Sequence, residues 1–280
     1  MTRFPLVLAA LLAIASATPA PAAETAVPLK TTEFGHGPTI VMVHDFGSAR
    51  MQWMPTARKL LAQHHVVLVD LPGHGDSPLP DPFSLEAAAA SIAGVLAKEQ
   101  GDSTVVVGQG LGGMLALMAA SAHPEAVKGV VIIDGWVKTP QAVPEQMQNY
   151  FLQMLDSNYD AMLKQMFISD GLDSAQGVVI HAKATLVPPA SIKAYLRQLL
   201  NADASGALKT LKPRLLYIGT SKHWPAEKKW AELAPSLGYA GAGPMETRRI
   251  EKAAALVASD QPDTLAAVLG DFASRAIAGK

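Results

Sequence analysis

Residues 105–113 read VVVGQGLGG and run without a break into the apolar segment MLALMAASA at residues 114–122. The β-branched run predicts a buried strand, the glycines predict a tight turn, and the apolar segment predicts a helix. Backbone N–H groups at such a turn, together with the positive end of the helix dipole, favour a negatively charged group. We therefore expect a functional site at the point where the chain turns from this strand into this helix.

Five short runs along the chain are apolar throughout instead of alternating, as in strands covered on both faces. They span residues 39–44, 66–70, 104–108, 130–134 and 214–219. Helix-length stretches separate the first four, at residues 50–62, 84–100 and 114–122. This alternation predicts an α/β fold with a doubly wound, mostly parallel sheet. Beyond residue 219 we expect a helix at 226–237, a last strand near 247–251 and a terminal helix from residue 263.

The alternation of strands and helices stops once, between residues 134 and 213. This segment contains no convincing strand, and its helical stretches lie near residues 143–157, 159–169, 175–186 and 191–202. An insertion after a strand of an open parallel sheet lies over the edge where such sheets bind ligands. We therefore expect a core formed by residues 24–135 and 213–280, with a helical cap at residues 136–212.

The glycine-rich turn fits two templates, of which the first is the dinucleotide-binding fingerprint. Gly108, Gly110 and Gly113 match G-x-G-x-x-G after a strand, and Asp134 ends the next strand, where a ribose-binding acid is expected. This fingerprint normally opens its fold, whereas here two strand–helix units precede it. An NAD-dependent oxidoreductase is the weakest of the three functions considered.

The second template is the nucleophile elbow G-x-S-x-G, which residues 108–112 (GQGLG) match except at the central position. Three more motifs fit the same family: HDFG at residues 44–47, DLPGHGDS at residues 70–77 and DQP at residues 260–262. From about residue 34 to residue 274, the chain resembles the α/β-hydrolase superfamily. The resemblance is to the capped branch, whose helical cap is inserted after the sixth strand of that fold.

The resemblance implies a serine nucleophile, a histidine base and an orienting acid, but this chain has other residues at those positions. Gly110 stands at the nucleophile position and Lys222 at the position of the acid. Counting back from Pro262, Ala255 stands where the family has histidine. The resemblance thus predicts the fold, while the degenerate triad argues against serine-hydrolase catalysis.

The oxyanion hole of the family uses backbone N–H groups, which do not depend on side chains. The resemblance assigns these donors to Phe46 and Leu111. Asp45 replaces a glycine beside them, and its charge would disfavour anionic ligands. His44 and His74 belong to turn motifs, and we expect both to have structural roles.

Other residues at the same sheet edge could form a rearranged site. His223 follows a predicted strand, and Asp134 and Asp45 follow two others, so His223 could act as a base oriented by Asp134. The interpretation we favour from sequence is instead a structural ion pair between Asp134 and Lys222. We expect no metal site, because no His, Asp and Glu spacing resembles one.

The composition excludes several classes of protein. The 280 residues carry 23 Lys+Arg against 24 Asp+Glu and include no cysteine. This rules out disulfides and a cysteine nucleophile, and the near-neutral charge does not suit nucleic acid binding. Residues 1–23 have a positive start, an apolar run at 4–17 and an Ala-Pro-Ala site, which predict a cleaved signal peptide. We therefore expect a periplasmic or secreted protein without a membrane span.

Three functions follow, in order of preference. The first is an exported α/β-hydrolase-fold pseudoenzyme that binds a small, mostly apolar ligand or a protein partner and uses no cofactor. The second is an active hydrolase of ester-type substrates, or a lyase, with a rearranged site of His223, Asp45 and Asp134. The third is the NAD-binding oxidoreductase.

Overall fold

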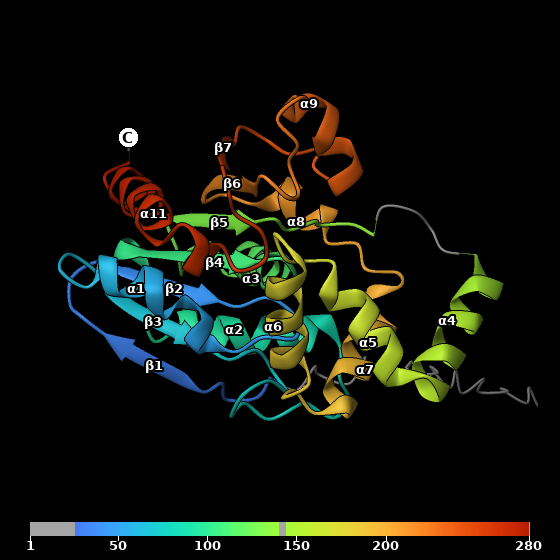
Figure 1. Cartoon of the computed structure of the whole chain (residues 1–280). Helices are drawn as coiled ribbons and strands as arrows, with labels where there is room; N and C mark the ends of the chain where they lie inside the picture. Colours follow the sequence, from blue (N-terminus) through green and yellow to red (C-terminus); the bar gives the residue numbers. More distant parts are fainter. Residues whose placement is uncertain (1–25, 140–143, 280) are drawn as a thin grey trace, which may run out of the picture.

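A computed structural model describes residues 26–139 and 144–279, and the predicted signal peptide therefore lies outside the described residues. Within these two ranges, seven strands form one sheet in the order β1-β3-β2-β4-β5-β6-β7 (Figure 1). The strands are β1 (Thr31–Phe34), β2 (Thr39–Val43), β3 (His65–Val69), β4 (Thr104–Gln109), β5 (Gly129–Ile133), β6 (Arg214–Thr220) and β7 (Glu246–Ile250). Only the pairing of β1 with β3 is antiparallel; the other neighbours are parallel.

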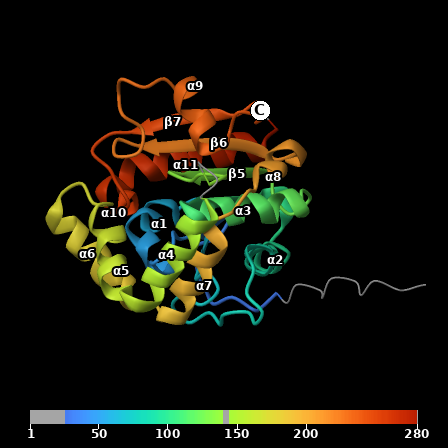
Figure 2. The same cartoon turned by 90° about the vertical axis from the view of Figure 1, so that its right-hand side faces the viewer.

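Helices cover both faces of this sheet because its central strands are apolar on both sides (Figure 2). One face packs against α2 (Leu85–Leu96), α3 (Leu111–Ala122) and α8 (Ser205–Thr210). The other face packs against α1 (Met54–Leu60), α10 (Val257–Asp260) and α11 (Pro262–Ile277). The core also contains short helices, which are η1 (Arg50–Trp53), η2 (Gly101–Ser103), α9 (Trp230–Leu233) and η3 (Ala234–Leu237). The prediction of a doubly wound, mostly parallel sheet is confirmed.

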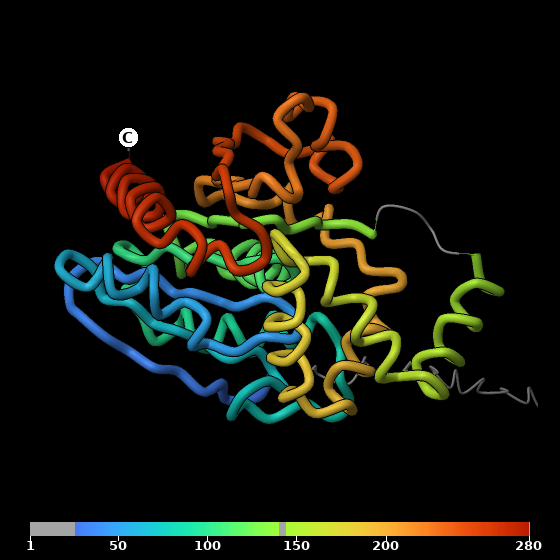
Figure 3. Tube along the Cα trace, viewed as in Figure 1, coloured from blue at the N-terminus to red at the C-terminus, as the bar shows by residue number. Residues whose placement is uncertain are grey.

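In the described part of the chain, four of the five helices between β5 and β6 form a layer beyond the carboxyl ends of the strands, and the trace in Figure 3 follows the chain through them. They are α4 (Glu145–Ser157), α5 (Tyr159–Ile168), α6 (Ser174–Ala184) and α7 (Pro189–Leu199). Their apolar cluster includes Leu155, Leu163 and Ile192, and Phe46 and Ala255 of the core pack against it. The segment at residues 140–143, which joins β5 to α4, lies outside the described residues.

The structure differs from the sequence-based expectation at three places. An antiparallel edge strand, β1, precedes the strands that the sequence pattern predicts. The expected helix at 226–237 is shorter, consisting of α9 and η3 only. Helix α8 lies inside the range expected for the cap but packs with α3 of the core.

Candidate active site

The turn after β4 brings the backbone of residue 110 to the edge of the sheet beneath the cap. Gly110 adopts φ +51° and ψ −120°, and its N–H donates to the carbonyl of Ile133 at 2.8 Å. A Cβ at Gly108 would overlap with the carbonyl of Gly112, and a Cβ at Gly112 would overlap with the carbonyl of His44. The glycines that flank position 110 are therefore required by close backbone contacts, and they permit the sharp turn.

The carboxylate of Asp45 occupies the space where a side chain at position 110 would begin. A Cβ built on Gly110 would overlap with all three atoms of that carboxylate group. The N–H groups of Phe46 and Leu111 donate to Asp45 Oδ1 at 2.7 and 2.9 Å. These are the two donors that the resemblance assigns to an oxyanion hole, and in this structure both bind a carboxylate of the protein itself.

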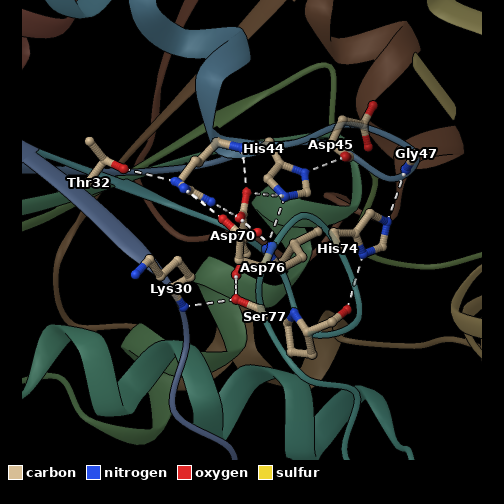
Figure 4. A network of polar contacts seen from close by, with 12 residues as sticks. Lys30, Thr32, His44, Asp45, Gly47, Asp70, His74, Asp76 and Ser77 are labelled. Atoms are coloured by element: carbon tan, nitrogen blue, oxygen red, sulfur yellow. Dashed lines mark hydrogen bonds and ion pairs between the residues drawn. The ribbon is translucent and has the colours of Figure 1, made fainter. Parts of the chain in front are cut away.

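Two buried histidines hold the loop that carries Asp45 (Figure 4). His44 Nε2 accepts from the N–H of Leu71 at 3.0 Å, so Nδ1 carries the proton and donates to the carbonyl of Asp45 at 2.7 Å. His74 Nε2 accepts from the N–H of Gly47 at 3.2 Å. Burial lowers the pKa of His44 to about 4 and that of His74 to about 3, so both rings are neutral.

These lowered pKa values predict an acid-sensitive fold. Between pH 6.5 and about pH 3 an unfolded histidine binds a proton that folded His74 does not, so stability falls as the pH falls. Replacing His74 with glutamine, which can still accept from Gly47, should reduce the slope of unfolding free energy against pH by about 1 kcal/mol per pH unit between pH 4 and 6. Urea unfolding measures this slope, and equal slopes in variant and wild type would contradict the expectation.

Asp134 and His223 form a pair across neighbouring strand ends. Asp134 follows β5, and its carboxylate accepts from the N–H and the hydroxyl of Thr220, both at 2.7 Å. His223 Nδ1 lies 3.2 Å from Asp134 Oδ2. The structure thus pairs Asp134 with His223 and records no ion pair with Lys222 among the described residues, so the preferred sequence interpretation was wrong. The reason is that His223 lies one residue further along the turn after β6, on the side facing Asp134.

The pKa of His223 reflects two opposing influences. Burial lowers it, whereas the hydrogen bond and charge of Asp134, with the charges of Asp170 and Asp45, raise it, and the net pKa lies above the ordinary value. The side chain remains 40% exposed, so solvent reaches the ring. Because Asp134 binds Nδ1, the other ring nitrogen is available to act on water or on a ligand.

A cavity of about 320 Å³ brings these groups together beneath the cap. Its polar lining comes from Asp45, Gln109, Asp134, Asp170 and His223, and its apolar lining comes from Phe46, Gly110, Leu111, Trp136, Met166, Phe167, Leu196, Leu199 and Ala255. This volume is at the lower end of the range for small-molecule pockets. Gly110 and Ala255 therefore converge on one cavity, whereas Lys222 does not line it.

Ala255 is fixed in the wall of this cavity from two sides. Its carbonyl accepts from Gln109 Nε2 at 2.7 Å, and its N–H donates to the carbonyl of Asp170 at 3.2 Å. Gln109 Oε1 in turn accepts from Gln52 at 3.1 Å. A methyl group thus stands at the position to which the resemblance assigns a histidine, and the cavity contains His223, which comes from a different loop.

Asp170 is a residue of the cavity that the sequence analysis missed. It follows α5 in the cap, and its carboxylate makes no hydrogen bond or ion pair within the described parts of the chain. Burial raises its pKa, against the attraction of His223 and Lys222. No motif surrounds Asp170, so only the folding of the cap over the sheet reveals its position.

The pKa of Asp45 is raised strongly. Burial raises it to about 7, although hydrogen bonds from Leu111 and Phe46 and the charge of His223 oppose the effect, and the charge of Asp170 adds to it.

The dinucleotide-binding template does not fit this turn. The carboxylate of Asp45 accepts the N–H of Leu111 at the start of α3, where that template places a pyrophosphate. The negative charge of the carboxylate would repel such a ligand.

The described residues show no other kind of centre. Within residues 26–139 and 144–279, no group of three or more His, Asp or Glu side chains could hold a metal ion. In the same ranges no helix is long and apolar enough to cross a membrane.

Comparison with known proteins agrees with the geometry of the sheet and turn. Residues 40–268 match the model of a family described as the alpha/beta hydrolase family. The chain belongs to this family. Among curated α/β-hydrolase relatives, a pimeloyl-[acyl-carrier protein] methyl ester esterase of Xylella fastidiosa strain M23 is 29% identical over 252 residues, covering 85% of this chain and 89% of the esterase. The esterase of the same name from Neisseria meningitidis serogroup C is 26% identical over 193 residues, covering 64% and 73%.

Solved structures of α/β-hydrolases share the fold at low sequence identity. A thermophilic esterase from Thermogutta terrifontis superimposes with a TM-score of 0.70 at 18% identity, covering 89% of this chain and 93% of the esterase. An enol-lactonase from Burkholderia xenovorans LB400 gives a TM-score of 0.69 at 17% identity, covering 88% and 96%. These likenesses establish the α/β-hydrolase fold.

Proposed function

We propose that this protein is an active hydrolase of small, neutral ester-type substrates, with His223 as general base and Asp134 as its orienting acid. The observation that carries the proposal is that the His223–Asp134 pair opens into the same cavity as Gly110 and Asp45. A histidine held through Nδ1 by a carboxylate has the arrangement that proton transfer to and from a reacting group requires. The curated relatives, which are named as methyl ester esterases, support the ester class. From sequence alone this function ranks second.

The lining of the cavity supports the proposed substrate. Trp136, Phe167 and Leu196 provide an apolar wall for an acyl chain. The carboxylates of Asp45, Asp134 and Asp170 surround the polar end and disfavour an anionic substrate. We therefore expect uncharged esters with short acyl chains to bind better than esters that carry a free carboxylate.

The second candidate is ligand binding without turnover, which ranks first from sequence alone. A specific observation favours it: the two N–H donors that would stabilise a substrate oxyanion already bind Asp45 Oδ1. Gly110 also supplies no nucleophile. A lyase that uses the same three residues, His223, Asp45 and Asp134, would also need His223 as its base. The variant His223→Gln therefore tests this alternative as well.

We also propose that the protein is exported, on the basis of the signal-like residues 1–23. Expression of the full chain in a Gram-negative bacterium, followed by fractionation and N-terminal sequencing, tests this. The expected product is periplasmic or secreted and begins near residue 24. An intact N-terminus in the cytosol would contradict export.

Steady-state hydrolysis of p-nitrophenyl acetate and butyrate tests the proposed function. We expect turnover above background, and replacing His223 with glutamine should lower kcat by about 100-fold, because a positioned base contributes on this scale. His123→Gln is the matched control, because His123 is an exposed histidine outside the cavity, and it should leave kcat unchanged. Absence of turnover in the wild type, combined with saturable binding of a non-hydrolysable analogue, would support the second candidate.

A further inference from the structure

Asp45 presents one free carboxylate oxygen where an α/β-hydrolase normally presents its nucleophile. Both N–H donors bind Oδ1, and Oδ2 makes no hydrogen bond or ion pair with any of the described residues. The carboxylate overlaps with the space of a side chain at position 110 and lines the cavity that contains His223. The missing side chain of Gly110 is thus replaced in space by a carboxylate from another loop.

We propose that Asp45 is the nucleophile of this enzyme, and that Oδ2 attacks the acyl carbon of the ester to form a covalent acyl-Asp45 anhydride. Carboxylates form covalent intermediates in other hydrolytic reactions, so the residue type is competent. The proposal rests on the proposed hydrolase function, and it assigns the residue that forms the covalent bond.

The first half-reaction uses His223 as an acid. A bond forms between Asp45 Oδ2 and the acyl carbon, and the bond between that carbon and the alcohol oxygen breaks. The departing alkoxide takes a proton from the imidazolium of His223, which Asp134 stabilises at 3.2 Å. The products are the free alcohol, neutral His223 and the mixed anhydride of Asp45 with the acyl group.

The second half-reaction uses the same histidine as a base. Neutral His223 takes a proton from water, and the hydroxide attacks Cγ of Asp45. The negative charge then develops on Oδ1, the atom that the N–H groups of Phe46 and Leu111 already hold. Collapse breaks the bond between Cγ and the bridging oxygen and releases the carboxylate product. Asp45 then loses its proton to solvent, and His223 is again protonated.

The position of the two N–H donors favours attack of water at Cγ of the anhydride over attack at its acyl carbon. Attack at the acyl carbon places negative charge on the carbonyl oxygen of the acyl group, and both donors are occupied by Asp45. Attack at Cγ instead places the charge on Oδ1, the atom that they already contact. Burial also raises the pKa of Asp45 to about 7, and a more basic carboxylate is a stronger nucleophile.

A single-turnover reaction in H₂¹⁸O, with enzyme in excess over p-nitrophenyl butyrate, separates the two routes. We expect unlabelled butyrate and one labelled oxygen in the peptide that contains Asp45, read by mass spectrometry. Label in the butyrate and none in Asp45 would overturn the attack of water at Cγ while leaving the proposed hydrolase function intact, and the hydroxylamine trap described below then decides whether Asp45 was acylated. Absence of any turnover would overturn both.

Two variants give an independent test. In His223→Gln the p-nitrophenolate leaves without protonation, so we expect a single-turnover burst followed by arrest, and hydroxylamine should trap a hydroxamate on Asp45. Asp45→Asn keeps an oxygen for the N–H donors but loses the nucleophile, so it should abolish the burst and lower kcat by at least about 100-fold. A burst that persists in Asp45→Asn, or a hydroxamate on another residue, would overturn the proposal.

Discussion

Replacing Asp70 with alanine is expected to destabilise the protein by about 3–5 kcal/mol, the usual effect of removing one partner from a buried ion pair. The Asp70 side chain is fully buried and pairs with the guanidinium of Arg50. It also accepts from the backbone N–H of Arg50 at 2.7 Å. The backbone N–H of Asp76 donates to the same carboxylate at 3.0 Å (Figure 4). Its loss would leave three donors unsatisfied in the turn that follows β3.

A matched control for this variant is Asp76→Asn. Asp76 contacts the same guanidinium at 2.9 Å, but its side chain is 66% exposed, and exposed ion pairs contribute at most about 1 kcal/mol. Urea unfolding followed by circular dichroism measures both effects. A similarly small effect of Asp70→Ala and Asp76→Asn would show that the turn does not depend on the buried carboxylate.

The sheet was predictable because the sequence pattern of its central strands has a direct physical cause. Strands β2 to β6 are buried on both faces, so their runs are apolar at nearly every position. Strand β1 was missed because its four residues, TTEF, lie at the edge and are only partly buried. The helix at 226–237 was overestimated, because its charged start, residues 226–229, precedes α9.

The candidate site was predictable only in part. Sequence motifs place Asp45, Gly110, Asp134 and His223 after separate strands, and parallel strands bring those positions to one edge. Motifs do not reveal that the carboxylate of Asp45 turns into the oxyanion hole, since this depends on the path of one loop. The partner of Asp134 likewise depends on the geometry of the turn after β6, which places His223 next to the Asp134 carboxylate instead of Lys222.

Placing a serine at position 110, without any other change, is expected to destabilise the protein. Gly110→Ser should destabilise the protein by about 3 kcal/mol, because the new Cβ overlaps with the carboxylate of Asp45. The carboxylate cannot move aside without breaking its hydrogen bonds from the N–H groups of Phe46 and Leu111. Gly94→Ser is the control. Gly94 lies in α2, and a Cβ added there would have no atom within 4 Å, so this change should be nearly neutral.

Adding Asp45→Gly to the Gly110→Ser variant should restore most of the lost stability. The double variant Asp45→Gly/Gly110→Ser removes the overlap, and only the strain of a non-glycine residue at φ +51° remains, about 1 kcal/mol. The double-mutant cycle should therefore show a coupling free energy of about 2 kcal/mol between positions 45 and 110, measured by urea unfolding. Additive effects would mean that Asp45 does not occupy the nucleophile space. Strong coupling would show that a side chain at position 110 and the carboxylate of Asp45 compete for the same space.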